Sequence, residues 1–479
     1  PKISVIVTGL EDWPTQPPQV RPVVEDRLLT AVRSRLPSVR RLLSPPLALE
    51  NDSPADPFER ANLIGAPVAT FPRWMVCPRC RLLASVRSGL FELDPNPYRP
   101  DQTVYRHVNC NEAKGRKPEA LPVRFLAACE RGHLDDFPWI EFVHNSQPCA
   151  SPQLRLMEYG PSGEARDLEV RCDACGAQRR LSQAFGEENR KKLPMCTGRR
   201  PHLRDFDADE CGQNVRPITL GASNMWFPVV LTAIAIPVES GRLAQLVAEN
   251  WRALVEIESI GSLRYARKRG DLQALNAYSD DELWEAIEDR KRQEANQQSE
   301  LPAPPDLKAP EWQVLTQYDP QRNGDDFRLQ PVGAPPRFAS LIRQVVLVER
   351  LREVRAMIGF MRIDSMGELN DPDLERPTEV APLSRRPPAW VPADEVRGEG
   401  IFIQFDEQAI ARWVEQKAVA ERSGQFFEAH KRWRSARRLD PPDGGFPAVR
   451  YVLLHSFTHA LMRQLALECG YTSASIRER

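Results

Sequence analysis

Nine cysteines between residues 77 and 211, together with His107, His133 and His144, constrain this chain more than any other feature of its sequence. They occur in closely spaced pairs, starting with Cys77-x-x-Cys80 and His107-x-x-Cys110. A Cys-x-x-Cys turn lets two thiolates approach one tetrahedral ion at about 2.3 Å. Pro1 is not preceded by a secretory signal, so a cytoplasmic location is the default expectation. Reduced thiols in that compartment predict metal ligands rather than disulfides.

Spacing along the chain predicts how these residues divide into sites. We expect three groups of four: Cys77, Cys80, His107 and Cys110; Cys129, His133, His144 and Cys149; Cys172, Cys175, Cys196 and Cys211. Three closed four-ligand sites are typical of structural zinc, so about three structural Zn²⁺ ions are predicted. An alternative joins Cys77, Cys80, Cys110 and Cys129 into one all-thiolate site, and any single histidine could instead be a packed core residue.

A short helix is expected to complete the second group. Asp136 can cap this helix, with Pro138 in its first turn. The helix would then carry His144 back toward the Cys129 turn.

Length and composition predict a folded, multidomain chain. With 479 residues, it exceeds the roughly 250–300 at which a single core stops growing. Hydrophobic residues at 41% and charged residues at 27% argue against a disordered chain. The apolar run Met225–Val238 is shorter than the ~20 residues of a membrane span, so no membrane association is expected. A net charge of −1 offers no overall attraction to nucleic acid, and any such signal must be local.

The expected fold class is α+β and multidomain, with a zinc-rich region of short strands and knuckles and a mainly helical C-terminal part. We divide the chain into a lead-in at 1–60, a zinc-binding module at 61–220, a mixed α/β core with Pro-rich linkers at 221–397, and the helical part at 398–479. Strands are predicted at 3–7, 225–238 and 401–405, and helices at 28–36, 242–259, 338–358, 406–438 and 449–468. Ser279 and Glu282 form a capping-box pattern that predicts a further helix.

The last helix carries a histidine pair. His455 and His459 are four residues apart, so both imidazoles lie on one face and could share a metal. The Glu of a His-Glu-x-x-His motif is missing, and a buried packing role is the competing interpretation. Cys469 lies ten residues further on, about 15 Å along a helix, too far to share an ion.

Other motifs bear on function through their absence or their charge. No Walker-type phosphate loop, dinucleotide-binding glycine motif or nucleophile elbow occurs, which argues against an ATPase or a hydrolase of those types. Three basic clusters could hold phosphates, one of them formed by residues 190–192 with Arg199 and Arg200. The other two are the candidate DNA contacts, in which Tyr265 and Trp433 could stack on exposed bases. Their members are Arg264, Arg267, Lys268 and Arg269 in the first cluster, and Arg432 and Arg434 in the second. Solvated helix faces would look the same.

Several multi-residue stretches resemble the DrmB family of the DISARM anti-phage defence systems, which carries a helicase-associated domain of unknown function. These stretches are scattered over residues 60–479: Arg124–Phe125 through Cys129–Trp139, Gly221–Asn224, Arg397–Ile401, Leu454–His459 and Glu468–Tyr471. The resemblance implies a bacterial protein that associates with a DrmA-like helicase ATPase, in a complex that binds foreign DNA. It also implies that family members continue past residues 473–479 into a Gly-rich, Cys-containing segment, which would leave the helicase-associated domain truncated here.

The sequence thus favours a non-catalytic, DNA-engaging subunit that partners a helicase-like ATPase. The family brings no established catalytic residues to this chain. Two alternatives stay open. One is a metal-dependent hydrolase or nuclease that uses His455 and His459, and the other is a pure protein scaffold.

Overall fold

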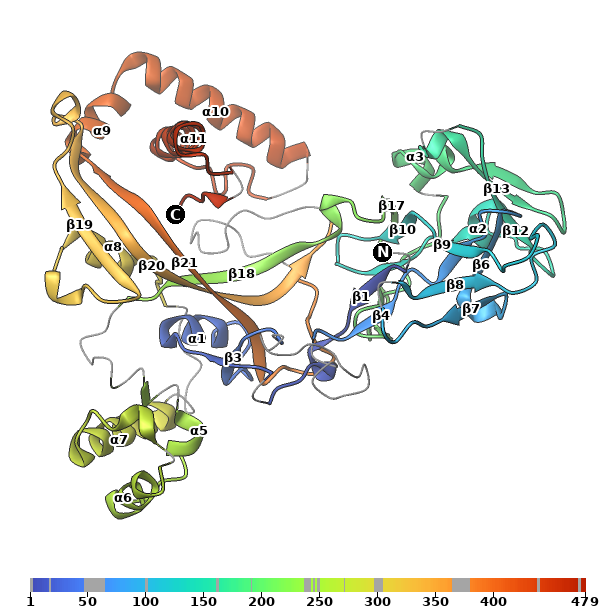
Figure 1. The fold of residues 1–479 in the computed structure, drawn as a ribbon. Helices are drawn as coiled ribbons and strands as arrows, with labels where there is room; N and C mark the ends of the chain where they lie inside the picture. The colour runs from blue at the N-terminus through green and yellow to red at the C-terminus, as the bar shows by residue number, and fades with distance from the viewer. Residues whose placement is uncertain are drawn as a thin grey trace.

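A computed structural model describes the chain at residues 3–16, 19–46, 65–99, 102–160, 163–190, 192–236, 243, 246–247, 250–270, 272–296, 305–363, 380–436, 440–472 and 475–479. Short strands gather at one end, long twisted strands run through the middle, and helices lie above and below them (Figure 1). The α+β class predicted from sequence is confirmed, as is the mainly helical C-terminal part.

The Cys/His module, by which we mean the described residues between 65 and 225, is built on short antiparallel strands. Its eight-stranded sheet has the order β14-β13-β12-β6-β5-β9-β8-β7. The bounds are β5 (Trp74–Val76), β6 (Leu82–Ser85), β7 (Phe91–Asp94), β8 (Val104–His107), β9 (Glu119–Pro122), β12 (Leu154–Glu158), β13 (Leu168–Cys172) and β14 (Gln178–Arg180).

Smaller elements complete the module. A three-stranded sheet, β11-β10-β17, holds β10 (Phe125–Ala128), β11 (Leu134–Asp136) and β17 (Arg216–Thr219). Further elements are α2 (Trp139–Val143), α3 (Glu187–Arg190), β15 (Arg199–Arg200) and β16 (Asp205–Phe206), and β4 (Val68–Thr70) pairs with β1 (Val5–Val7). The aromatic rings of Phe137, Trp139 and Phe142 are almost fully buried and pack α2 onto the sheet.

The central sheet, β18-β20-β21-β3-β2 with β19 paired to β20, is built from much longer strands. Its members are β2 (Pro22–Val23), β3 (Arg41–Leu43), β18 (Phe227–Ile234), β19 (Phe327–Val332), β20 (Ile342–Met361) and β21 (Trp390–Phe405). Helix α1 (Asp26–Arg33) packs on β18 and β20 through Leu28 and Val32, both fully buried. The predicted strand in the apolar run Met225–Val238 is confirmed as β18.

The helix predicted at 338–358 is wrong, because this segment is strand β20. Val354, Ala356 and Ile358 are buried at every second position, as a strand requires. Near Val348 the register with β21 shifts, and such a bulge interrupts the alternation. The resulting spacing of three between apolar residues imitates a helix.

Helices α5 (Trp251–Leu254), α6 (Ile260–Lys268) and α7 (Asp280–Asn296) follow β18 and precede β19 in the chain, and they form a group apart from the central sheet (Figure 1). This group has its own core, which includes Leu263, Leu283 and Ile287, all fully buried. The helix predicted at 242–259 is described only in part and ends at Leu254. The predicted capping box is confirmed, since Ser279 Oγ accepts from Glu282 N at 3.2 Å and Glu282 Oε2 accepts from Ser279 N at 2.9 Å.

The remaining helices cover one end of the central sheet (Figure 1). They are α8 (Lys308–Thr316), α9 (Glu407–Val414), α10 (Lys417–Ala436) and α11 (Val449–Cys469). The last three confirm the helices predicted at 406–438 and 449–468, although residues 437–439 lie outside the described part. Among the described residues, no helix has both the length and the hydropathy that a membrane span requires.

Candidate metal centres

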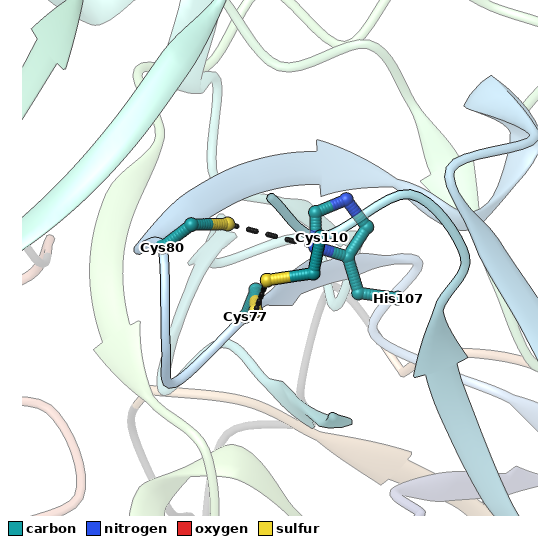
Figure 2. A group of neighbouring side chains, drawn as sticks. All are labelled: Cys77, Cys80, His107 and Cys110. Atoms are coloured by element: carbon teal, nitrogen blue, oxygen red, sulfur yellow. Dashed lines mark hydrogen bonds between the residues drawn. The ribbon is translucent and has the colours of Figure 1, made fainter. Parts of the chain in front are cut away.

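The first centre lies where two strand connections of the eight-stranded sheet meet. Cys77 and Cys80 occupy the turn between β5 and β6, and His107 ends β8. Strand β9 pairs with β5 on one side and with β8 on the other. This arrangement brings the residues at the end of β8 to the β5–β6 turn, and Cys110 lies there as well. Figure 2 shows the four side chains pointing toward one another. Cys77 and His107 are 0% and 4% exposed. This group of four is the one that the sequence predicted.

The second centre joins the Cys129–His133 turn to Cys196 and Cys211. Strand β10 runs into Cys129, and Gly132 turns the chain with a φ of +79°. A Cβ atom at Gly132 would lie 2.7 Å from the Cβ of Ala381, so this turn excludes any larger residue.

Antiparallel pairing of β10 with β17 brings Cys211 beside Cys129, because Ala128 is opposite Arg216. A bridge between Met195 and Asn214 brings Cys196 to the same place, where its amide donates to Gln213 O at 2.9 Å. The second centre is therefore assembled by pairing between segments that are far apart in the sequence.

The third centre joins His144 and Cys149 to the Cys172–Cys175 knuckle. Helix α2 ends at Val143, which places His144 at its C-cap. Cys172 ends β13, and Gly176, with a φ of +77°, closes the knuckle through an N–H donated to Cys172 O at 2.9 Å.

The predicted grouping of the second and third centres is therefore corrected. The sequence analysis grouped Cys129 and His133 with His144 and Cys149. In the structure, the first two residues lie with Cys196 and Cys211, and the other two lie with Cys172 and Cys175. Asp136 does not cap α2. Its carboxylate accepts from Arg73 N at 2.7 Å and Arg73 Nε at 2.9 Å. All twelve predicted ligands still come together, in three groups of three cysteines and one histidine.

Ligand separations test whether these groups fit zinc. Around one tetrahedral zinc, two thiolates lie about 3.8 Å apart and a thiolate and an imidazole nitrogen about 3.5 Å apart. The sulfur pairs Cys77–Cys110, Cys129–Cys211 and Cys149–Cys172 are each 3.8 Å apart. The sulfur-to-nitrogen pairs Cys80–His107, Cys129–His133 and Cys175–His144 are 3.5, 3.4 and 3.4 Å apart. The donor set fits a tetrahedral thiolate-binding metal.

Two of the histidines are oriented by a second hydrogen bond, as metal-bound histidines usually are. Asp207 Oδ2 lies 3.1 Å from His133 Nε2, which leaves Nδ1 for the metal. His144 Nδ1 donates to Ile140 O at 2.8 Å, which leaves Nε2 facing Cys175. The sequence analysis missed Asp207, because nothing in its spacing marks it as a partner of His133.

In each of the second and third centres, the electrostatics favour a thiolate at one cysteine, Cys129 or Cys172. The pKa values of the neighbouring Cys196, Cys211 and Cys149 are raised. A hydrogen bond from the Cys196 thiol, opposed by burial and reinforced by His133, lowers the pKa of Cys129 to about 4. Burial raises the pKa of Cys172, but backbone hydrogen bonds outweigh it and bring this pKa down to about 6. A buried thiolate is costly unless a cation compensates it, and a bound metal ion would do so.

The basic residues predicted to contact DNA lie in different surroundings. On α6, Asp280 pairs with Arg264 Nε at 3.1 Å and with Arg267 Nη1 at 2.5 Å. Lys268 and Arg269 are exposed on the same helix, and Arg432 is exposed on α10. Arg434 is 5% exposed and donates to Pro441 O at 2.8 Å, so the structure corrects its prediction as a DNA contact.

The histidine pair lies on one face of α11, as predicted. The ring centroids of His455 and His459 are 4.4 Å apart. Glu478, which the sequence analysis did not single out, lies beside both rings. Cys469 is exposed at the far end of the helix.

Comparison with known proteins agrees with the resemblance noted in the sequence. A family model described only as a domain of unknown function, DUF8724, matches residues 1–227, which include the three centres. The DISARM protein DrmB of Bacillus paralicheniformis is 29% identical over 434 residues, which cover 86% of this chain and 72% of the relative. Over most of its length, the chain is therefore similar to a DISARM protein of the DrmB type.

Proposed function

We propose that this chain is a non-catalytic subunit of a DISARM anti-phage defence system, where it partners a DrmA-like helicase ATPase and contacts DNA. The observation that carries the proposal is its similarity to DISARM protein DrmB over 434 residues. The sequence contains no recognisable nucleotide-binding loop, which fits a division of labour with an ATPase partner. Ten free cysteines support a reducing, cytoplasmic location.

We further propose that the three Cys/His centres hold structural Zn²⁺. Each would be a closed site with three thiolates and one imidazole, which leaves no open position for substrate. Thiolate-rich tetrahedral sites select zinc over magnesium or calcium, which prefer oxygen ligands. The bound ions would fix the turns that join the short strands of the module.

The DNA contact is proposed for α6. Arg264, Lys268 and Arg269 are exposed there, and Tyr265 is 66% exposed beside them. Guanidinium and ammonium groups can neutralise phosphates, and an exposed tyrosine ring can stack on an unpaired base. Asp280 neutralises part of the charge on Arg264 and Arg267, so Lys268 should contribute more than either of them.

Charge reversal tests this contact in the assembled complex. We expect Lys268→Glu with Arg269→Glu to weaken DNA binding, measured by fluorescence anisotropy, and to reduce the slope of log affinity against log salt by about 1 per lost phosphate contact. Lys417→Glu with Arg412→Glu makes the same change in net charge at two exposed residues of α10 and α9, so it is the matched control and should change neither quantity. If both variants lost DNA affinity equally, the effect would come from the overall charge of the chain and not from a contact at α6.

Co-purification tests the partnership itself. The chain, co-expressed with a DrmA-like helicase from the same bacterium, should be recovered with it in a defined ratio after DNA has been digested. Failure to form this complex would contradict the proposal. A complex whose DNA affinity is unaffected by the α6 variants would favour a protein scaffold.

A further inference from the structure

A fourth cluster of possible metal ligands lies outside the Cys/His module, between α11 and the segment 475–479. His455 Nδ1 is 2.6 Å from Glu478 Oε1, and His459 Nε2 is 4.0 Å from Glu478 Oε2. The ligand atoms of all three residues lie within 4.8 Å of one another. Two imidazoles and one carboxylate are a donor set that first-row divalent metals accept.

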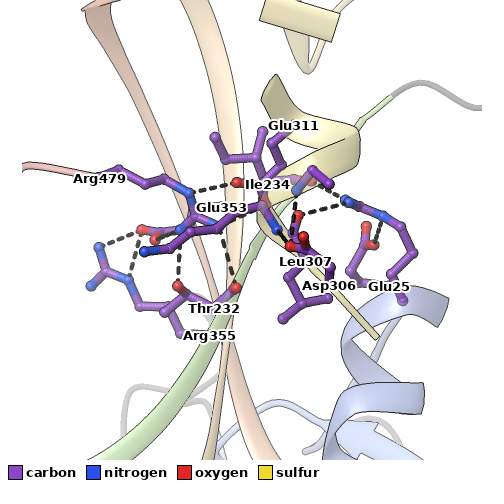
Figure 3. A network of polar contacts seen from close by, with 12 residues as sticks. Glu25, Thr232, Ile234, Asp306, Leu307, Glu311, Glu353, Arg355 and Arg479 are labelled. Atoms are coloured by element: carbon purple, nitrogen blue, oxygen red, sulfur yellow. Dashed lines mark hydrogen bonds and ion pairs between the residues drawn. The ribbon is translucent and has the colours of Figure 1, made fainter. Parts of the chain in front are cut away.

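The Glu478 side chain is directed to α11 by its two neighbours in the chain. Arg479 donates to Glu311 Oε2 and Oε1 at 2.7 and 2.6 Å and to Thr232 Oγ1 at 2.8 Å. Figure 3 shows this network, in which Glu353 also accepts from Arg479 at 3.0 Å.

Arg477 binds Glu353 as well, at 3.3 Å. Arg477 and Arg479 thus both contact the central sheet, while Glu478 between them points to the helix. This is the alternation of an extended chain. Glu311, which binds Arg479, is 4% exposed and also accepts from Ile234 N at 2.8 Å. The residue that holds Arg479 in place is therefore buried.

One oxygen of Glu478 is buried without a hydrogen bond. Within the described part of the chain, Glu478 Oε2 makes none, although a buried polar atom normally has one. Its separation of 4.0 Å from His459 Nε2 is slightly longer than the ~3.4 Å between two ligands of a tetrahedral zinc at 2.1 Å. A small rotation would let both atoms bind one ion, which would satisfy the orphaned oxygen.

The two rings are held in place without a metal. His455 stacks on Tyr451, with centroids 5.5 Å apart and planes inclined by 11°. The His459 ring lies edge-on to that of His455, with planes inclined by 76°. The side chains of His455 and His459 are 43% and 57% exposed, so one side of the cluster faces solvent.

We propose that His455, His459 and Glu478 bind one divalent transition-metal ion, with Zn²⁺ as the reference ion, and leave a coordination position open to solvent. Three protein ligands with a free fourth position distinguish this centre from the three closed Cys/His centres, because open sites can bind water or a substrate oxygen. This inference rests on the geometry of α11 and the 475–479 segment and does not depend on the proposed function. Without a metal, the same residues would form only an ion pair that fastens the segment to the helix.

Metal titration of the full chain separates these two possibilities. Protein whose Cys/His centres have been filled with zinc is titrated with Zn²⁺ by calorimetry, and we expect one further ion per chain. Co²⁺ bound at this position should give a spectrum without thiolate charge transfer, because no cysteine takes part. His455→Gln, His459→Gln and Glu478→Gln should each weaken this binding at least ~100-fold, the upper end of what loss of an outer-shell partner costs.

Two substitutions serve as matched controls. His430→Gln removes a histidine of α10 whose Nε2 donates to Gly444 O at 2.8 Å, and Cys469→Ser removes the cysteine at the end of α11. Both should retain the additional ion. If a variant loses its fold, the Co²⁺ spectrum of the unsubstituted chain still decides, since it reports nitrogen and oxygen ligands directly. Absence of a further ion in the unsubstituted chain, or its persistence in all three ligand variants, would overturn the proposal.

Discussion

The Cys/His module and the central sheet achieve stable structure by different means. Strands of the eight-stranded sheet in the module are three to five residues long, and cysteines and histidines lie at the ends of several of them. In the central sheet, β20 has 20 residues and β21 has 16, and no Cys/His group lies among the described residues of either strand. Burial of aliphatic side chains at alternating positions stabilises the central sheet. The module combines an apolar core, which includes Phe137, Trp139 and Phe142, with Cys/His groups that could hold metal ions between its turns.

The two regions meet through a few buried polar contacts. Arg362, at the end of β20, is 2% exposed and donates to Gly132 O at 2.9 Å, inside the Cys129–His133 turn. His202 of the module donates to Pro382 O at 2.9 Å and packs edge-on against Phe360. Apolar packing of Ile363 in one cluster with Leu126 adds to these polar contacts, so disturbance of one region should reach the other through this junction.

The largest effect should come from the loss of a metal ligand in the module. Cys172→Ser should release one of three zincs, because a serine hydroxyl does not replace a thiolate. Zinc binding supplies ~10–16 kcal/mol in folded zinc-finger peptides, so we expect the β13–β14 region to lose much of its protection. Elemental analysis and hydrogen exchange would measure both effects, and β18, β20 and β21 should keep their protection.

The same variant tests the grouping of ligands. The structure predicts that the two remaining zincs each have three sulfur ligands and one nitrogen. The grouping expected from sequence would leave one such site and one with two sulfurs and two nitrogens. X-ray absorption at the zinc edge distinguishes these cases, and a fitted sulfur number well below three would contradict the structure.

A smaller effect is expected from Leu231→Ala, a substitution in the central sheet. Leu231 is 3% exposed on β18 within the central core, and its truncation should cost about 2–5 kcal/mol of unfolding free energy. Zinc content should remain unchanged. Ile401→Ala on β21, where the side chain is 44% exposed, is the matched control and should cost well under half as much. Zinc loss in Leu231→Ala would show that the two regions fold as one unit.

The sequence revealed the metal ligands better than it revealed their partners. A pair such as Cys172 and Cys175 is local, so its spacing alone identifies it. The choice between partners depends on which distant strands pair, and β10 pairs with β17 some 90 residues further on. No local pattern contains that information. Asp207 and Glu478 escaped notice for the same reason, since each becomes significant only beside a histidine that is remote in sequence.

The helices of the C-terminal part were predicted well, and so was α7, because its cap at Ser279 is a local signal. Strand β20 was predicted wrongly as a helix. Its bulge interrupts the two-residue alternation of apolar side chains and gives them a spacing close to the three and a half residues of a helix. Its valines at 345, 346 and 348 favour a strand, and greater weight on β-branched residues would have corrected the prediction.

A pH-dependent effect of intermediate size is expected at the junction between the regions. Burial lowers the pKa of His202 from its ordinary 6.5 to about 4. Between pH 4 and 6.5, His202 is protonated in the unfolded chain and neutral in the folded chain. The free energy of unfolding should therefore fall as the pH drops from about 6.5 to about 4, by up to ~3 kcal/mol. Above pH 6.5 this group should contribute no pH dependence.

His202→Gln tests this expectation, because its amide can still donate to Pro382 O but does not titrate. Chemical denaturation of both proteins from pH 4 to 8 should give curves that diverge only below pH 6.5, with the variant less sensitive to acid. Acid release of zinc would affect both proteins equally and cancel in the difference. Parallel curves would show that His202 is not held neutral in the folded chain.

The smallest effect is expected in the α5–α7 group, which depends on neither a metal nor long strands. Ser279→Ala removes the hydroxyl that accepts from Glu282 N, and loss of such a cap costs ~1 kcal/mol, within a range of about 0.5–2. Hydrogen exchange should show weaker protection at the start of α7 and none lost in β18 or β19. Ser435→Ala, an exposed serine in the last turn of α10, should be neutral or slightly stabilising, because alanine favours helix. If the loss at Ser279 spread into the central sheet, the helical group would be part of the sheet's cooperative unit rather than an insertion with a core of its own.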